Sequence, residues 1–194
     1  MNRDGGGRVP RRLRLELIAA GAMLEQAGLI LAGEGNLSVR LDGSGFLITP
    51  RGCDKGRLEP ADLVVVSWHQ DPIPPRASSE TRIHSAVYRI RPEVIAVAHA
   101  HPPAVQALAR DGRVPDCSLL TEGGDLLGAV GWVPALPPGS VELAEATAHA
   151  LARSPACVLA QHGAVTVGGS VDQATRRMLL LERLAALSAE VGLR

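Results

Sequence analysis

Aromatic residues are scarce in this sequence, whose 194 residues include two Trp, one Tyr and one Phe. A core of this size must therefore be filled by Val, Leu, Ile and Ala. Cysteine is sparse as well: Cys53, Cys117 and Cys157 lie far apart and form no CxxC pair. This spacing argues against a disulfide framework or a cysteine-based metal site and fits a reducing compartment.

Net charge and long apolar runs are also absent. Lys plus Arg balance Asp plus Glu at 20 each, so no net field draws the chain to nucleic acid or to an anionic membrane. No apolar run reaches the about 18 residues of a membrane span. The opening "MNRDGGGRVP" lacks the apolar segment of a signal peptide. We therefore expect a cytoplasmic protein with no nucleic-acid or membrane partner.

What remains is an ordinary globular composition, with 46% apolar and 21% charged residues. Residues 1–10 are Gly-rich and are predicted to be disordered, and residues 11–194 are predicted to form one domain. In its first half the pattern predicts a helix over 11–27, a hairpin of "NLSVRL" and "GFLIT" joined by "DGSG", and a strand at "DLVVVSW".

The second half alternates helices and strands. The pattern predicts a helix from Glu80 to Arg91 with Ser79 as its N-cap, and a helix that follows a Ser140 cap. The last helix, 171–190, follows a capping-box pattern. Strands are predicted at "EVIAVAHAH", "GAVGWVP" and twice in "ACVLAQHGAVTVGG", and a short helix at "PAVQALAR". This order predicts a single α/β domain with a mainly antiparallel or mixed sheet and helices on its faces.

Two histidines mark the end of the best predicted strand, "IAVAHAHP". Side chains alternate along a strand, so His99 and His101 are expected to face the same side. His162 also follows an apolar strand, and Gly163 next to it permits a sharp turn. Three neutral imidazoles suit a catalytic Zn²⁺. The alternative is a set of half-buried, hydrogen-bonded histidines, because spacing alone does not show that they converge.

The other histidines are interpreted as structural or solvated. His84 lies four residues after Glu80 on the same helical face, and Tyr88 extends that face. We assign His84 and Tyr88 to structure or to a subunit contact. His69 in a Pro-rich loop and His149 on a helix are expected to be solvated.

Five motifs in order resemble the class II aldolase/adducin family over about residues 11–190. They are "GEGNLSVR", "FLITPRGCDKGRLEPADLVVV", "SSETRIHSAVYRIRPEVIAVAHAHP", "PPGSVELA" and "CVLAQHGAVTVGGSVDQA". The resemblance implies a three-layer fold with a central, mainly antiparallel sheet flanked by helices. It also implies a homotetramer with active sites between subunits.

The resemblance implies roles for individual residues. His99, His101 and His162 would bind zinc, and Glu80 would transfer protons. The sequence does not distinguish zinc from Mn²⁺, Co²⁺ or Fe²⁺. The substrate phosphate would bind at the residues that match the family's pocket, which are Gly35, Asn36, Arg51, Gly52, Ser78 and Ser79.

The chemistry of these residues agrees with a phosphate pocket. A glycine permits close approach of an anion, amides and hydroxyls donate hydrogen bonds, and a helix N-terminus favours phosphate. The alternative is that Asn36 closes a turn and Ser79 only caps its helix. Arg51 departs from the family pattern, in which Ser or Thr is commoner; it either adds charge to the pocket or points away.

The implied reaction is a retro-aldol cleavage of a phosphorylated ketose through a metal-stabilised enediolate, giving dihydroxyacetone phosphate and an aldehyde. Aldolases of the family use tyrosines to protonate the aldehyde oxygen, but the only Tyr here is Tyr88, at a different place. Glu122 is a candidate substitute acid, or else a structural residue at a Gly-Gly turn.

Three other functions stay open for a protein with this fold. They are a dehydratase of a methylthio-ribulose phosphate, a sugar-acid phosphate decarboxylase, and an adducin-like interaction module without catalysis. The three histidines and Glu80 favour an enzyme over the module.

Overall fold

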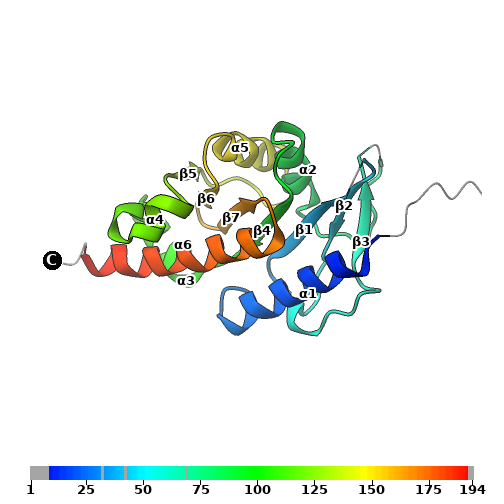
Figure 1. Cartoon of the computed structure of the whole chain (residues 1–194). Helices are drawn as coiled ribbons and strands as arrows, with labels where there is room; N and C mark the ends of the chain where they lie inside the picture. The colour runs from blue at the N-terminus through cyan, green and yellow to red at the C-terminus, as the bar shows by residue number, and fades with distance from the viewer. Residues whose placement is uncertain (1–8, 32, 42, 69, 192–194) are drawn as a thin grey trace, which may run out of the picture.

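A seven-stranded sheet runs through the centre of the protein (Figure 1). The computed structural model describes residues 9–31, 33–41, 43–68 and 70–191. The strand order is β3-β2-β1-β4-β7-β6-β5, and all neighbours pair antiparallel except β5 and β6, which are parallel. The predicted fold class, a mainly antiparallel sheet flanked by helices, is confirmed. The strands are β1 (Asn36–Leu41), β2 (Gly45–Ile48), β3 (Val64–Ser67), β4 (Ala96–Ala100), β5 (Val130–Val133), β6 (Ala156–Leu159) and β7 (Gly163–Gly168).

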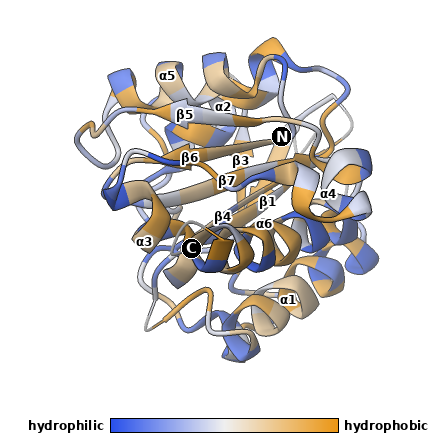
Figure 2. Cartoon of the chain, turned by 90° about the vertical axis from the view of Figure 1, so that its left-hand side faces the viewer, coloured by the Kyte–Doolittle hydropathy of each residue, from blue (hydrophilic) through white to orange (hydrophobic). Residues whose placement is uncertain are grey.

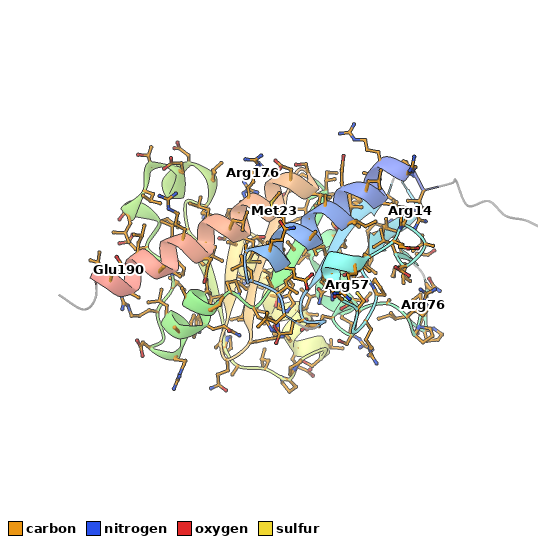
Figure 3. The ribbon with its side chains drawn as sticks, turned by 90° about the horizontal axis from the view of Figure 1, so that it is seen from below. Arg14, Met23, Arg57, Arg76, Arg176 and Glu190 are labelled. Carbon is orange, nitrogen blue, oxygen red and sulfur yellow. The ribbon has the colours of Figure 1, made fainter. Side chains whose placement is uncertain are left out.

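Helices cover both faces of this sheet (Figure 2). α2 (Thr81–Ile90) and α5 (Val141–Leu151) lie on one face. α1 (Arg11–Gln26), α3 (Pro103–Arg110) and α6 (Val171–Val191) lie on the other, with α4 (Thr121–Leu126) packed beside α6. Figure 3 shows α1 and α6 side by side along this second face, with Met23 on α1 and Arg176 on α6. Two short 3₁₀ turns, Lys55–Arg57 and Cys117–Leu119, complete the structure.

Strand alternation divides the core into two clusters. Along β4, Ala96, Ala98 and Ala100 pack against the layer of α1, α3 and α6, whereas Val97 packs towards α2 and α5. His99 is two residues from Val97 and therefore faces α2 as well. β1 follows the same rule: Leu37 belongs to the first cluster, so the polar residues between its apolar positions are turned to α2.

Most element boundaries agree with the sequence patterns to within a few residues. Ser140 caps α5 as predicted, because its Oγ accepts a hydrogen bond from the N–H of Leu143 at 3.0 Å. The predicted cap of α2 is wrong: Glu80 occupies the N-cap position and Ser79 makes no side-chain capping bond. Instead, Ser78 Oγ accepts a hydrogen bond from the N–H of Glu80 at 3.3 Å.

Several expectations concern other parts of the chain. Helix α4 and the two 3₁₀ turns were not predicted, because their short stretches show no clear periodicity. His149 is exposed, as expected. His69 and most of the Gly-rich N-terminal segment lie outside the described residues. Among the residues that the structure describes, no helix combines the length and the apolar character needed to cross a bilayer.

Candidate metal and substrate site

The three predicted histidines converge at one end of the sheet. His99 ends the apolar part of β4, His101 follows that strand, and His162 lies in the turn between β6 and β7. β4 and β7 are neighbouring strands, and this pairing carries His162 to the β4 histidines across 61 residues of sequence. One nitrogen from each ring lies within 4.8 Å of the others, and the predicted shared face of His99 and His101 is confirmed.

Hydrogen bonds orient two of these rings. The Nδ1 of His99 lies 2.9 Å from the carbonyl oxygen of Ala164, so Nδ1–H donates and Nε2 carries a lone pair. That Nε2 lies 2.9 Å from Glu80 Oε2 and 3.2 Å from His101 Nε2. Nδ1 of His101 faces Glu34 Oε2 at 3.4 Å. The other ring nitrogen of His101, Nε2, therefore points towards Nε2 of His99.

These atoms fit a divalent cation. Two imidazole lone pairs and a carboxylate oxygen converge, and such acceptors repel one another unless a proton or a metal ion lies between them. Two buried atoms at the site, Glu80 Oε1 and His162 Nδ1, have no hydrogen-bond partner among the described residues. His99, His101 and His162 are thus the residues that could hold a metal, with Glu80 in reach.

Burial and mutual charge tune the titration of the cluster. Burial lowers the pKa of His162 to about 4, and the nearby His99 adds to this effect. The pKa of His101 is lowered for the same two reasons. Burial opposes charge on His99, but Glu80 outweighs it and raises the pKa of His99 above its usual value. At neutral pH His101 and His162 are therefore in the neutral form that binds metals.

Glu80 is a buried carboxylate at the start of α2. Its Oε2 accepts a hydrogen bond from Asn36 Nδ2 at 3.1 Å, and its Oε1 lies 3.3 Å from His162 Nε2. Burial alone would raise the pKa of Glu80, but His99 and His162 outweigh it and hold the pKa well below its usual value. The carboxylate is therefore ionised beside the histidine cluster.

A cavity of about 370 Å³ opens over this cluster. Its wall includes all six residues predicted to bind phosphate: Gly35, Asn36, Arg51, Gly52, Ser78 and Ser79. Glu80, His101 and His162 also line it. Gly35 has a φ of +61°, and a Cβ there would lie 2.7 Å from the His99 carbonyl oxygen, so glycine is required for both reasons. Arg51 is exposed at the cavity mouth, and a second cavity of about 570 Å³ adjoins it there.

The candidate acid Glu122 and the single tyrosine, Tyr88, both lie outside the cavity wall. Glu122 is exposed on α4, a helix that packs against α6, and it is not among the residues that line the cavity. Tyr88 is 2% exposed and lies behind the site, where its hydroxyl contacts Ser38 Oγ at 2.8 Å. The structural interpretation of His84 and Tyr88 is supported by contacts within this one chain.

Sequence reasoning missed two residues that shape the cavity. Glu34 orients His101, and its place directly before the Gly35-Asn36 motif was the signal that could have found it. Lys55 is 1% exposed. Its Nζ donates hydrogen bonds to the carbonyls of Gly33 at 3.1 Å and Cys53 at 2.9 Å, joining the two loops that border the cavity. A lone Lys among charged residues gives no sign of burial.

Comparison with known proteins places this site in a family. Residues 15–189 match the family described as "Class II Aldolase and Adducin N-terminal domain". The chain belongs to the class II aldolase/adducin family. Within the family the fold is close to that of a solved L-fuculose-1-phosphate aldolase from Thermus thermophilus. That structure has a TM-score of 0.85 and 37% sequence identity, with 94% of this chain and 95% of the other covered.

Similar proteins of the family carry names for three different reactions. A 3-oxo-tetronate 4-phosphate decarboxylase from Pectobacterium atrosepticum is 33% identical over 187 residues, which is 94% of this chain and 86% of the relative. A 5-methylthioribulose-1-phosphate/5-deoxyribulose-1-phosphate aldolase from Rhodospirillum rubrum is 35% identical over 179 residues, covering 89% and 78%. A methylthioribulose-1-phosphate dehydratase from Acidiphilium cryptum is 33% identical over 189 residues, covering 90% of this chain and 89% of the relative.

Proposed function

We propose that this protein is a zinc-dependent lyase that cleaves a carbon–carbon bond beside the carbonyl of a phosphorylated ketose. The observation that carries this proposal is the ionised Glu80 carboxylate, 2.9 Å from His99 and 3.3 Å from His162. A buried base next to three imidazoles is an arrangement for proton transfer at carbon, beyond what a structural metal site needs. The names of the similar aldolases support this substrate class.

His99, His101 and His162 would hold the metal. When bound, it would act as a Lewis acid towards the substrate's carbonyl and adjacent hydroxyl oxygens. Glu80 is ionised at rest, so it would first take up a proton from solvent. It would then give that proton to the enediolate carbon after cleavage, and remove a proton from that carbon in the reverse direction. Its Oε1 suits this role, because that oxygen has no hydrogen-bond partner among the described residues.

The phosphate would bind at the other end of the cavity. Ser78 and Ser79 precede helix α2, whose N-terminus favours an anion. The Arg51 guanidinium at the mouth adds a positive charge that the family pattern lacks. The substrate would thus be held by its phosphate while its carbonyl end reaches the histidines.

A specific observation favours a second candidate, decarboxylation of a sugar-acid phosphate. The chain's single tyrosine is buried between α2 and the sheet with its hydroxyl against Ser38, so it is not placed to protonate an aldehyde oxygen in the cavity. Loss of CO₂ leaves one carbanion to protonate, and Glu80 can supply that proton, once it has taken one from solvent, without a second acid. The name of the Pectobacterium relative agrees with this chemistry, and that of the Acidiphilium relative keeps a dehydratase as a third candidate.

A homotetramer with active sites between subunits completes the proposal. Within one chain Glu122 lies away from the cavity. It therefore serves as the second acid of an aldolase or dehydratase only if a neighbouring subunit supplies it. An adducin-like module without catalysis would have no need for a buried, ionised Glu80 beside three histidines.

A product screen tests the proposal. Zinc-loaded protein is incubated with phosphorylated ketoses and sugar-acid phosphates, and products are identified by mass. An aldehyde with dihydroxyacetone phosphate identifies an aldolase, loss of water a dehydratase, and loss of CO₂ a decarboxylase. Glu80→Gln is the matched control, because it keeps the side-chain size and should keep the zinc but lose turnover. A fully active Gln variant would disprove the role of Glu80.

A further inference from the structure

A chain of buried polar side chains leads away from Glu80 into the protein. Glu80 Oε2 is bonded to Asn36 Nδ2 at 3.1 Å, and Asn36 Oδ1 lies 2.5 Å from His84 Nε2. His84 Nδ1 lies 2.6 Å from Ser38 Oγ, which is 2.8 Å from the Tyr88 hydroxyl. His84 and Ser38 are both 0% exposed. Such a fully buried network is not needed to close a hydrophobic core, and it ends on the proposed catalytic group.

The local geometry of two elements produces this chain. Glu80, His84 and Tyr88 follow one another at intervals of four residues and share one face of α2. Asn36 and Ser38 are two residues apart on β1 and share one face of that strand. β1 lies next to β4, with Asn36 directly opposite His99. The two polar rows therefore interlock beneath the histidine cluster.

The hydrogen bonds have a direction that starts at Glu80. An ionised carboxylate only accepts, so the Asn36 amide must turn its NH₂ group to Glu80 and its carbonyl oxygen to His84. His84 must then carry its proton on Nε2, and its Nδ1 accepts from the Ser38 hydroxyl. Because the Ser38 proton goes to His84, Ser38 Oγ can only accept from Tyr88, whose single hydroxyl proton is shared between Ser38 Oγ at 2.8 Å and the carbonyl oxygen of Ile95 at 3.3 Å. Reversing any member would place two acceptors or two donors against each other.

We propose that His84 is a positioning residue for Glu80, acting through Asn36; the inference rests on the proposed proton-transfer role of Glu80. The imidazole holds the Asn36 carbonyl, and the amide then fixes Oε2 of the carboxylate. Oε1 is left as the oxygen that exchanges the proton. His84 is not among the residues that line the cavity and is not one of the three clustered histidines, so we expect it to affect the orientation of Glu80 and not the binding of metal or phosphate.

Two amide substitutions test this role because they replace different halves of the ring. In His84→Gln the amide nitrogen reaches about as far as Nε2 and can donate to Asn36. In His84→Asn the shorter side chain reaches only the Nδ1 position and can meet Ser38 alone. We expect the Gln variant to keep kcat within about threefold. We expect the Asn variant to lose kcat by about 10- to 100-fold, the range typical of lost supporting contacts.

Three readouts separate positioning from folding. KM and bound zinc should stay near the wild-type values in both variants, and melting temperatures should fall by similar amounts. Crystal structures supply a readout that needs no activity: the Asn36 Nδ2 to Glu80 Oε2 bond should persist in the Gln variant and be lost in the Asn variant. Retention of that bond in both variants, or equal kcat for the two, would overturn the inference.

These outcomes are distinguishable from failure of the proposed function. If the wild-type protein cleaves none of the phosphorylated sugars, the lyase proposal fails, and the crystal structures still decide whether His84 orients Glu80. Nitrogen NMR of the His84 ring adds an independent check of the bond direction. A proton on Nδ1 in place of Nε2 would reverse the chain and refute the proposed positioning.

Discussion

Acidification should destabilise this protein through His84. The ring is fully buried, and this burial, with a smaller effect from His99, lowers its pKa from 6.5 to about 3. Both ring nitrogens are already engaged, since Nε2 faces Asn36 and Nδ1 faces Ser38. A second proton would have to displace the Ser38 hydroxyl proton. The unfolded chain therefore takes up a proton on this residue long before the folded chain does.

The sign and size of the effect follow from this difference. Between pH 6.5 and about 3 the unfolded state binds more protons, so stability rises with pH in this window and is lost as pH falls. At pH 5, 1.5 units below the unfolded pKa of about 6.5, the cost is about 2 kcal/mol relative to pH 8, at 1.36 kcal/mol per unit. One residue thus removes a substantial part of a typical folding free energy of about 5–15 kcal/mol.

Urea unfolding of wild-type and His84→Gln proteins measures this cost. Both are unfolded at pH 5 and pH 8, at one protein concentration and with a chelator, so that metal release does not contribute. The Gln variant lacks the titrating group and should lose about 2 kcal/mol less on going from pH 8 to pH 5. Equal losses in the two proteins would refute the reasoning, because His84 would then not be buried in its neutral form.

Three other substitutions probe the site and its supports. His101→Ala removes one of three proposed ligands and should empty the metal site in elemental analysis; unchanged zinc would exclude His101 as a ligand. Lys55→Met leaves two loop carbonyls without their donor and should lower the unfolding free energy in urea by about 2–4 kcal/mol. In Gly163→Ala the new Cβ would collide with the Ala100 carbonyl, so the melting temperature should fall. In Gly169→Ala the new Cβ would meet only Gln173 Oε1, at an ordinary contact distance of 3.6 Å, and the melting temperature should stay unchanged.

Local patterns were enough to predict most of the fold. The alternation in "AVAHAH" predicted the shared face of His99 and His101, and the periodicity of "VDQATRRMLLLERLAALSAEV" predicted the long helix α6. The cap of α2 was predicted wrongly because Ser78 and Ser79 are adjacent and either can serve a helix start; the structure uses the Ser78 hydroxyl to bind the N–H of Glu80. A choice between neighbouring serines depends on backbone angles that the sequence does not show.

The site could be predicted only as far as the family resemblance carried it. His162 is brought to His99 by the antiparallel pairing of β4 with β7, and spacing along the chain contains no information on that pairing. The orienting contacts from Glu34 and the Ala164 carbonyl were equally invisible. Long-range pairing of strands decides these contacts, and residue-type patterns describe only single elements.

Asn36 illustrates why a residue type does not fix a role. Its motif predicted either a phosphate ligand or a turn residue, yet its amide group joins Glu80 to His84 inside the protein. The two functions are compatible, since an amide NH₂ has two hydrogens and Glu80 occupies one. The second hydrogen is the one available to a substrate in the cavity that Asn36 lines. A substrate bonded there would be tied directly to the carboxylate that moves its proton.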